Sequence, residues 1–119
     1  MIERFINYII YIIIVNQSKM EEKERPKIPE NCILVGTKPF MAYMKSVNTL
    51  FRGKNLSEIE IRARGKNIKK AIDIAESSRK KFCHDLNLKI KKIDIDTDSF
   101  TSEEGREINV STITIILER

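Results

Sequence analysis

Short apolar runs and alternating stretches divide the chain after residue 30 into predicted elements. Residues 32–35, Cys-Ile-Leu-Val, form a compact apolar run that ends at Gly36 and is typical of a buried strand. From Phe40 to Phe51 apolar residues recur every three or four positions, which predicts a helix. This helix is expected to begin at Thr37-Lys38-Pro39, with Thr37 as a possible cap, and to end in the polar run 52–55.

The next two elements follow from a change of period. Leu56, Ile59 and Ile61 alternate with charged residues, which predicts a second strand. After a turn at Gly65, apolar residues again repeat at helical spacing from Ile68 to Phe82. We therefore expect a second helix over this range.

Two further strands complete the pattern. Residues 86–95 predict a third strand, although the apolar parity changes after Ile90, which indicates a β-bulge or a strand that begins only after that residue. Residues 98–105 are polar, with a turn signal at Glu103-Glu104-Gly105, and residues 108–117 predict a β-branched fourth strand. The order β-α-β-α-β-β predicts an α+β fold, an α/β sandwich with two helices on one sheet.

Residues 1–30 have a different pattern. Residues 5–15 are eleven uncharged residues, too few to cross a bilayer, which needs about 20. They lack the basic flank and the cleavage site of a signal peptide. Residues 20–30 are charged and contain Pro26 and Pro29, so we expect a flexible leader there and a domain over 31–119. For residues 1–19 we favour a mis-assigned start codon, and the alternatives are an interfacial anchor or a packed extra strand.

The distribution of charge narrows the class of partner. The chain has 22 Lys and Arg against 17 Asp and Glu, a net charge of +5. Residues 1–30 hold five of each sign, so the whole excess lies in residues 31–119. This balance favours polyanionic partners, nucleic acid before an anionic membrane. Two cysteines and one histidine exclude the common four-ligand Cys/His zinc site and a disulfide-dense scaffold, and favour a reduced intracellular setting.

Groups suited to catalysis are few. His84 is the only histidine, and its neighbour Cys83 is adjacent in sequence, a spacing at which side chains rarely face one another. Asp94, Asp96 and Asp98 are spaced by two, so a continuous strand would place them on one face, where they could bind a divalent cation. A solvated strand end is the more ordinary interpretation. We therefore predict no enzyme, no cofactor and no metal, and keep a metal-dependent nuclease as the least favoured hypothesis.

The basic residues are better organised, because they gather where both helices start. Gly36-Thr37-Lys38 could offer backbone N–H groups and one ammonium to a phosphate. Arg62 and Arg64 share one strand face, and the helix start after Gly65 offers a second anion site. In a parallel β-α-β unit both helices start at the same end of the sheet, so the two sites would form one electropositive edge. For either cluster alone a solvated helix start is the more ordinary interpretation, but two clusters at the starts of both helices favour binding of anions. The predicted contacts to nucleic acid are Thr37, Lys38, Arg62, Arg64, Lys66, Lys69 and, at the tip of the last hairpin, Arg106.

Three stretches stand in an order and spacing that together are specific. They are ILVGTKPFMAY at 33–43, IEIRARGKNIKKA at 59–71, and TSEEGR at 101–106 followed by VSTI at 110–113. Together they resemble the Alba family of small archaeal DNA/RNA-binding chromatin proteins. The resemblance spans residues 31–119 and leaves residues 1–30 without a counterpart.

The resemblance implies a homodimer in which each subunit carries two helices on one face of a four-stranded mixed sheet. It also implies binding to double-stranded DNA and RNA with little sequence preference, a part in chromosomal DNA packaging, and a cytoplasmic location on the nucleoid. Lys38 matches the second lysine of the family's usual pair, whereas Thr37 replaces the first, whose acetylation weakens DNA binding in some members. That replacement puts such regulation in doubt here. Arg62, Arg64 and Arg106 match basic positions of the family.

The resemblance also gives Phe82 a role, because it matches an aromatic position through which dimers meet along DNA. We therefore predict that Phe82 is partly exposed, the alternative being an ordinary core phenylalanine. The favoured function is sequence-independent binding of nucleic acid through a basic surface, without a membrane partner. The alternative is a protein subunit of an RNA-processing particle, with RNA as the ligand.

Overall fold

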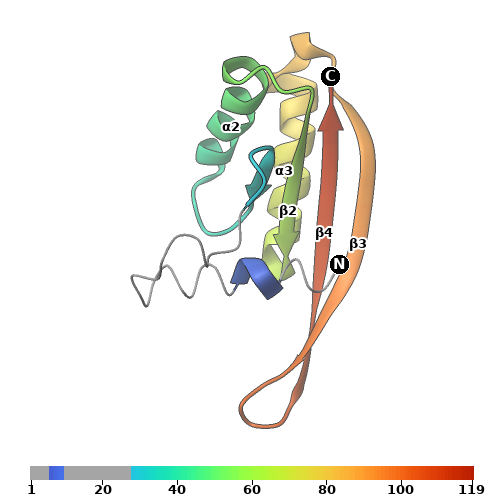
Figure 1. Cartoon of the computed structure of the whole chain (residues 1–119). Helices are drawn as coiled ribbons and strands as arrows, with labels where there is room; N and C mark the ends of the chain where they lie inside the picture. Colours follow the sequence, from blue (N-terminus) through green and yellow to red (C-terminus); the bar gives the residue numbers. More distant parts are fainter. Residues whose placement is uncertain (1–5, 10–27) are drawn as a thin grey trace.

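The computed structural model describes residues 6–9 and 28–119 (Figure 1). The elements from residue 28 onward are β1 (Cys32–Leu34), α2 (Phe40–Asn48), β2 (Glu58–Arg64), α3 (Ile68–Ser77), β3 (Lys89–Thr101) and β4 (Glu107–Glu118). This order confirms the predicted β-α-β-α-β-β pattern and the α+β class. Each helix ends in a wider π-helical turn, Thr49–Gly53 after α2 and Ser78–Phe82 after α3, so both helical stretches end close to the predicted positions.

The four strands form one mixed sheet in the order β1-β2-β4-β3. β1 runs parallel to β2, while β4 is antiparallel to both β2 and β3. The parallel pair is joined by α2, and both helices lie on the same face of the sheet (Figure 1). We call the opposite face, which carries Glu60, Arg62 and Arg64 of β2, the open face.

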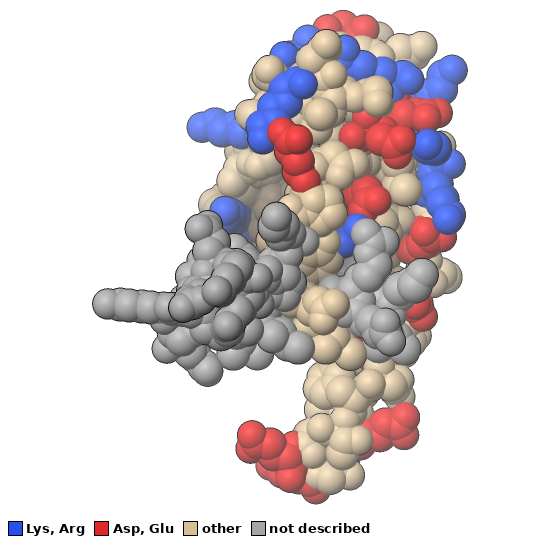
Figure 2. Space-filling view, in the orientation of Figure 1, with Lys and Arg blue, Asp and Glu red and all other residues tan. Residues whose placement is uncertain are grey.

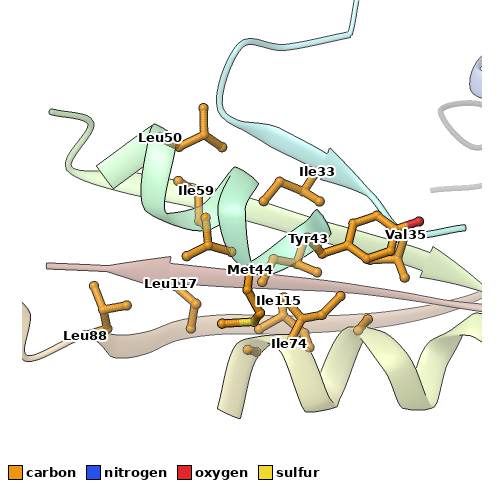
Figure 3. Packing of buried hydrophobic residues seen from close by; sticks show 14 of the residues in the cluster. Ile33, Val35, Tyr43, Met44, Leu50, Ile59, Ile74, Leu88, Ile115 and Leu117 are labelled. Carbon is orange, nitrogen blue, oxygen red and sulfur yellow. The ribbon is translucent and has the colours of Figure 1, made fainter. Parts of the chain in front are cut away.

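The core lies between the two helices and the sheet (Figure 3). Ile59, Ile61 and Ala63 alternate inward along β2, and all three are buried. From α3, Ile74 packs into the same cluster, at the centre of a helix whose remaining faces are largely charged. Apolar side chains at helical and strand periods therefore meet in one layer, as the sequence pattern predicted.

The third strand is longer than predicted. It begins at Lys89 and continues to Thr101, well into the polar region that was expected to be a loop. The predicted bulge is confirmed, because the pairing with β4 shifts register between Ile90 and Lys92. Beyond the helices the β3–β4 hairpin projects as an arm (Figure 1), so both of its faces reach solvent and polar residues suffice there.

The start of the chain is described only at residues 6–9, which form a helical turn. Tyr8 in this turn is buried, with 8% of its surface exposed. Where it is described, the apolar start is therefore a helix rather than the extra strand considered above. Most of the predicted leader lies outside the described residues, and the domain boundary at residue 31 stays a prediction.

Candidate nucleic-acid interface

Lys70 of α3 holds the starts of the two helices together. Its ammonium donates to the carbonyl oxygen of Gly36 at 2.8 Å and to that of Lys38 at 3.2 Å. The same ammonium lies 5.7 Å from the ring centre of Tyr43 on α2. The loop before α2 is thus tied to the first turns of α3, and the predicted meeting of the two helix starts at one end of the sheet is confirmed.

The loop before α2 differs in detail from the prediction. The hydroxyl oxygen of Tyr43 accepts hydrogen bonds from the backbone N–H of Gly36 at 2.7 Å and of Lys38 at 3.2 Å. These two donors are therefore already used within the chain and are not open to a phosphate. The expectation that Thr37 caps the helix is wrong, because Pro39 occupies the cap position and no side chain bonds there. Thr37 and Lys38 are exposed beside this loop.

No motif in the sequence indicates this role for Tyr43. Its position fits the helical period of core residues, and it is indeed buried with 4% of its surface exposed. Only its hydroxyl group, at the end of a long side chain, reaches the loop. A buried tyrosine whose hydroxyl must find a polar partner is the one general signal that could have suggested it.

The chain turns from β2 into the second helical stretch at Gly65, which has φ of +56°. A residue with a side chain is strained at this backbone angle, so glycine suits the sharp change from β2 to the helix. Next to it, Lys66 is exposed and forms no ion pair within the described part of the chain. Lys69 is also exposed and pairs with Asp73 at 2.8 Å. We call Lys38, Arg64, Lys66 and Lys69 the basic edge.

Arg62 does not belong to this exposed group. Only 1% of its surface is exposed, because Tyr8 covers it and Glu60 pairs with its guanidinium. Arg62 and Arg64 do share the open face, as the spacing predicted. In this arrangement, however, Arg62 is buried and cannot contact a phosphate.

Arg64 faces a buried carboxylate. A guanidinium nitrogen of Arg64 lies 3.8 Å from a carboxylate oxygen of Asp98 on β3, and Asp98 is fully buried. Among the residues that the structure describes, neither oxygen of Asp98 has a hydrogen-bond donor. Burial raises the pKa of Asp98, and the charge of Arg64 opposes that rise only in part. The positive charge of Arg64 is therefore partly offset by Asp98 within the protein.

Replacing Asp98 by asparagine is expected to raise stability relative to wild type progressively as the pH increases from 3 to 7. The raised pKa means that the folded state binds the proton of Asp98 more tightly than the unfolded state, so the stability that Asp98 itself contributes is largest at acid pH. That contribution is lost as pH rises from the unfolded pKa, about 3.9, through the folded pKa. Urea unfolding from pH 3 to 7 would measure it, with the exposed Asp94→Asn as the control. A D98N chain clearly less stable than wild type at pH 7 would contradict this assignment.

The two remaining predicted site residues lie far from the basic edge. Arg106 is exposed at the tip of the hairpin, 4.0 Å from Glu104, and the tip also carries Glu103 and Glu107. Figure 2 shows these acidic side chains at the far end of the arm. Phe82 ends the π-helical turn after α3 and is 50% exposed, which confirms the predicted partial exposure.

A second group of basic side chains, which sequence reasoning missed, gathers at the end of the molecule opposite the hairpin tip (Figure 2). Most of these side chains have carboxylate partners. Arg52 pairs with Asp85 at 2.6 Å, and Lys91 pairs with Glu58 at 3.0 Å. The same holds for Lys54, Arg79, Lys80 and Lys92. Because these charges are offset locally, this group attracts a polyanion less than its number of cations suggests.

The three aspartates of β3 do not form a cluster. Asp94 pairs with Lys92 at 3.4 Å, while Asp98 faces Arg64. Within residues 6–9 and 28–119, no three side chains of His, Cys, Asp or Glu are grouped so that they could hold a metal ion. In the same ranges, no helix has the length and apolar character that crossing a bilayer requires.

The chain is similar to known proteins of one family. The Alba family model matches residues 31–97. The DNA/RNA-binding protein Alba of Picrophilus torridus is 49% identical over 90 residues, which are 76% of this chain and 97% of that protein. The protein of the same name from Methanococcus maripaludis is 43% identical over 88 residues, 74% of this chain and 97% of that protein. The solved structure of Alba from Thermoplasma volcanium superposes with a TM-score of 0.66 at 46% identity, covering 75% of this chain and 100% of that one.

Proposed function

The chain belongs to the Alba family, and from this premise we propose that it binds double-stranded DNA and RNA through the basic edge without reading base sequence. Its relatives carry the name DNA/RNA-binding protein Alba. The observation that carries the proposal is the bridge from Lys70 to the loop before α2, since it joins the two helix starts in one basic surface. We propose that the chain acts by binding rather than by catalysis.

The contacts we propose are to phosphates. Lys38 and Lys66 are exposed and form no ion pair among the described residues, so their charges are available to a polyanion. Arg64 can turn from Asp98 to a phosphate, because at 3.8 Å the two groups are too far apart for a hydrogen bond. Base readout needs side chains that reach base edges in a groove, and the basic edge offers long cations on helix starts instead. Thr37 beside Lys38 adds a hydroxyl but no charge.

Arg106 extends this surface along the arm. The exposed tip projects from the end of the sheet where both helices start (Figure 1). Three glutamates surround Arg106, so its attraction to phosphate is smaller than that of a basic tip. We propose that the basic edge supplies most of the affinity and that the arm adds one contact.

We propose further that the protein acts as a homodimer formed along β3. Ile93 and Ile95 stand opposite Ile115 and Ile113 of β4, so they lie on the helix-bearing face, yet they are 53% and 79% exposed. Ile95 also lines an open groove of about 360 Å³ between the start of α3 and the hairpin. Exposed apolar side chains on a free edge strand are what a second copy would cover.

Coating of DNA follows from this arrangement. Dimers that meet through the half-exposed Phe82 would bind side by side and contribute to packaging of chromosomal DNA in the cytoplasm, on the nucleoid. A role in an RNA-processing particle is the alternative, and the word RNA in the name of the relatives keeps it open. Titration of duplex DNA and of a structured RNA at the same salt concentration separates the two.

The experiment that tests the proposed function is Arg64→Ala. Each phosphate neutralised on duplex DNA contributes about −0.9 to the slope of log K against log salt. Because a dimer carries Arg64 twice, the variant is expected to lower the magnitude of the slope by up to about 2. Fluorescence anisotropy with one duplex over a range of salt concentrations measures it, and Arg79→Ala, which removes a cation paired with Glu76, is the matched control.

Two results would count against the proposal. One is a salt slope that does not change in Arg64→Ala. The other is a wild-type preference for one duplex sequence over a scrambled one by more than about 2 kcal/mol, because one good base contact is worth roughly 1–3 kcal/mol.

A further inference from the structure

The helical turn of residues 6–9 lies against the open face of the sheet. Tyr8, in the helical turn 6–9, lies over Arg62 of β2, 54 residues away in sequence. A small cavity beside this contact is lined by Tyr8 and Ile9 together with Leu34 of β1, Arg62 and Arg64. The turn therefore lies on the open face where β1 and β2 meet, next to Arg64 of the basic edge.

The guanidinium of Arg62 has two hydrogen-bond partners, Tyr8 on one side and Glu60 on the other. Its guanidinium donates to the hydroxyl oxygen of Tyr8, and the carbon at the centre of the guanidinium lies 5.0 Å from the centre of the Tyr8 ring. On the other side it donates twice to the carboxylate of Glu60. Arg62 is left with 1% of its surface exposed and Tyr8 with 8%. The turn thus removes from solvent a cation on the strand that carries Arg64.

Without the turn, Arg62 would keep its pairing with Glu60, but the guanidinium nitrogen that now donates to Tyr8 would be open to a phosphate. Arg62 is two residues from Arg64 on the same face of β2, a separation of about 7 Å along an extended strand. Successive phosphates of one nucleic-acid strand are spaced on the same scale. A hydrogen bond from a guanidinium to a charged phosphate is stronger than its bond to a neutral phenol.

We propose that residues 6–9 compete with nucleic acid for Arg62. When the turn is docked, Tyr8 occupies Arg62 and the basic edge binds without it. When the turn is released, Arg62 joins Arg64 in contacting the phosphate backbone. Because the turn is part of the same chain, its high effective concentration makes the docked state compete well although the contact is small. This inference rests on the proposed function.

The test compares Tyr8→Ala with wild-type full-length protein. The variant is expected to bind a duplex DNA of mixed sequence about threefold to tenfold more tightly at low salt, with a salt slope larger by up to about 0.9 per subunit. Tyr8→Phe keeps the ring and loses the hydroxyl, so a smaller gain is expected. The matched control is Asn7→Ala, because Asn7 is exposed in the same turn.

Arg62 itself supplies the decisive comparison. Arg62→Ala in the wild-type background is expected to change affinity less than twofold, whereas in the Tyr8→Ala background it should abolish the gain. Modification by phenylglyoxal, located by peptide mass, gives a readout that needs no nucleic acid. Arg62 should be protected in wild type and reactive in Tyr8→Ala, with Arg106 reactive in both.

The outcomes separate this inference from the function on which it rests. Unchanged or weaker binding by a folded Tyr8→Ala chain, a gain that survives Arg62→Ala, or ready modification of Arg62 in wild type would each overturn the competition and leave the proposed function intact. Failure of the wild-type chain to bind either duplex DNA or RNA would overturn the proposed function, and the competition with it. If Tyr8→Ala does not fold, Tyr8→Phe decides by the same criteria.

Discussion

The double substitution Ile93→Asp and Ile95→Asp is expected to give a monomer that binds duplex DNA on the order of a hundredfold more weakly than wild type at about 0.1 M salt. These two side chains lie on β3 and are the most exposed of the large apolar residues described, and Ile95 also lines the groove. A carboxylate at either position would have to lose its water when a second copy covers β3. The free energy of this desolvation is larger than the apolar contact between the two copies can offset.

The loss of binding follows from the loss of one set of contacts. A dimer presents the basic edge twice, and the second set binds as an intramolecular event once the first is engaged. The monomer should therefore show about half the salt slope of the dimer. Light scattering after size exclusion gives the mass, and anisotropy titrations at several salt concentrations give the slope.

Two controls separate assembly from charge. The pair Ile93→Asn and Ile95→Asn adds no negative charge, so weaker binding by that variant reflects the lost partner alone. Met41→Asp places one carboxylate at an exposed apolar position of α2 and should leave the dimer intact. A double aspartate variant that keeps the mass of a dimer would show that the two subunits meet elsewhere.

The second large effect is on stability. Phe51→Ala is expected to lower the free energy of unfolding by about 3–5 kcal/mol, the usual range for removing a fully buried aromatic ring. Phe51 has no exposed surface, and it lies in the π-helical turn that ends the first helical stretch. Its carbonyl oxygen also accepts a hydrogen bond from Arg119, whose guanidinium lies 5.8 Å from the centre of the Phe51 ring. Urea unfolding measures the loss, which is a large part of the total for a domain of this size.

Phe82→Ala is the matched control, because it removes the same ring from a position that is half exposed. It should cost less than about 1.5 kcal/mol and leave the dimer folded, while lowering the cooperativity with which dimers coat DNA. A loss of about 3 kcal/mol or more at Phe82 would instead assign it to the core and remove the proposed contact between dimers.

The order and type of the elements could be predicted from the amino-acid sequence, because the apolar period of each element depends on residues close together in the chain. Ile59, Ile61 and Ala63 alternate with polar residues because one face of β2 packs against the helices. This alternation can be recognised from the residues of β2 alone. The parity change after Ile90 predicted either a bulge or a later start of the strand, and the structure has the bulge, since a strand cannot keep one face buried across such a change without an extra residue. The basic residues near both helix starts could also be identified, because the predicted elements show where each helix begins.

The exposure and the polar partners of those basic residues could not be predicted, because they depend on contacts between distant parts of the chain. Arg62 and Arg64 look equivalent in the sequence, yet one is covered by Tyr8 and the other faces Asp98, partners that lie 54 and 34 positions away. The backbone donors before α2 are used by Tyr43, whose helical position identifies it only as a core residue. A periodic pattern records which face of an element is buried against its neighbours. It does not record which distant polar group meets a given cation, because that choice is made by the packing of the whole chain.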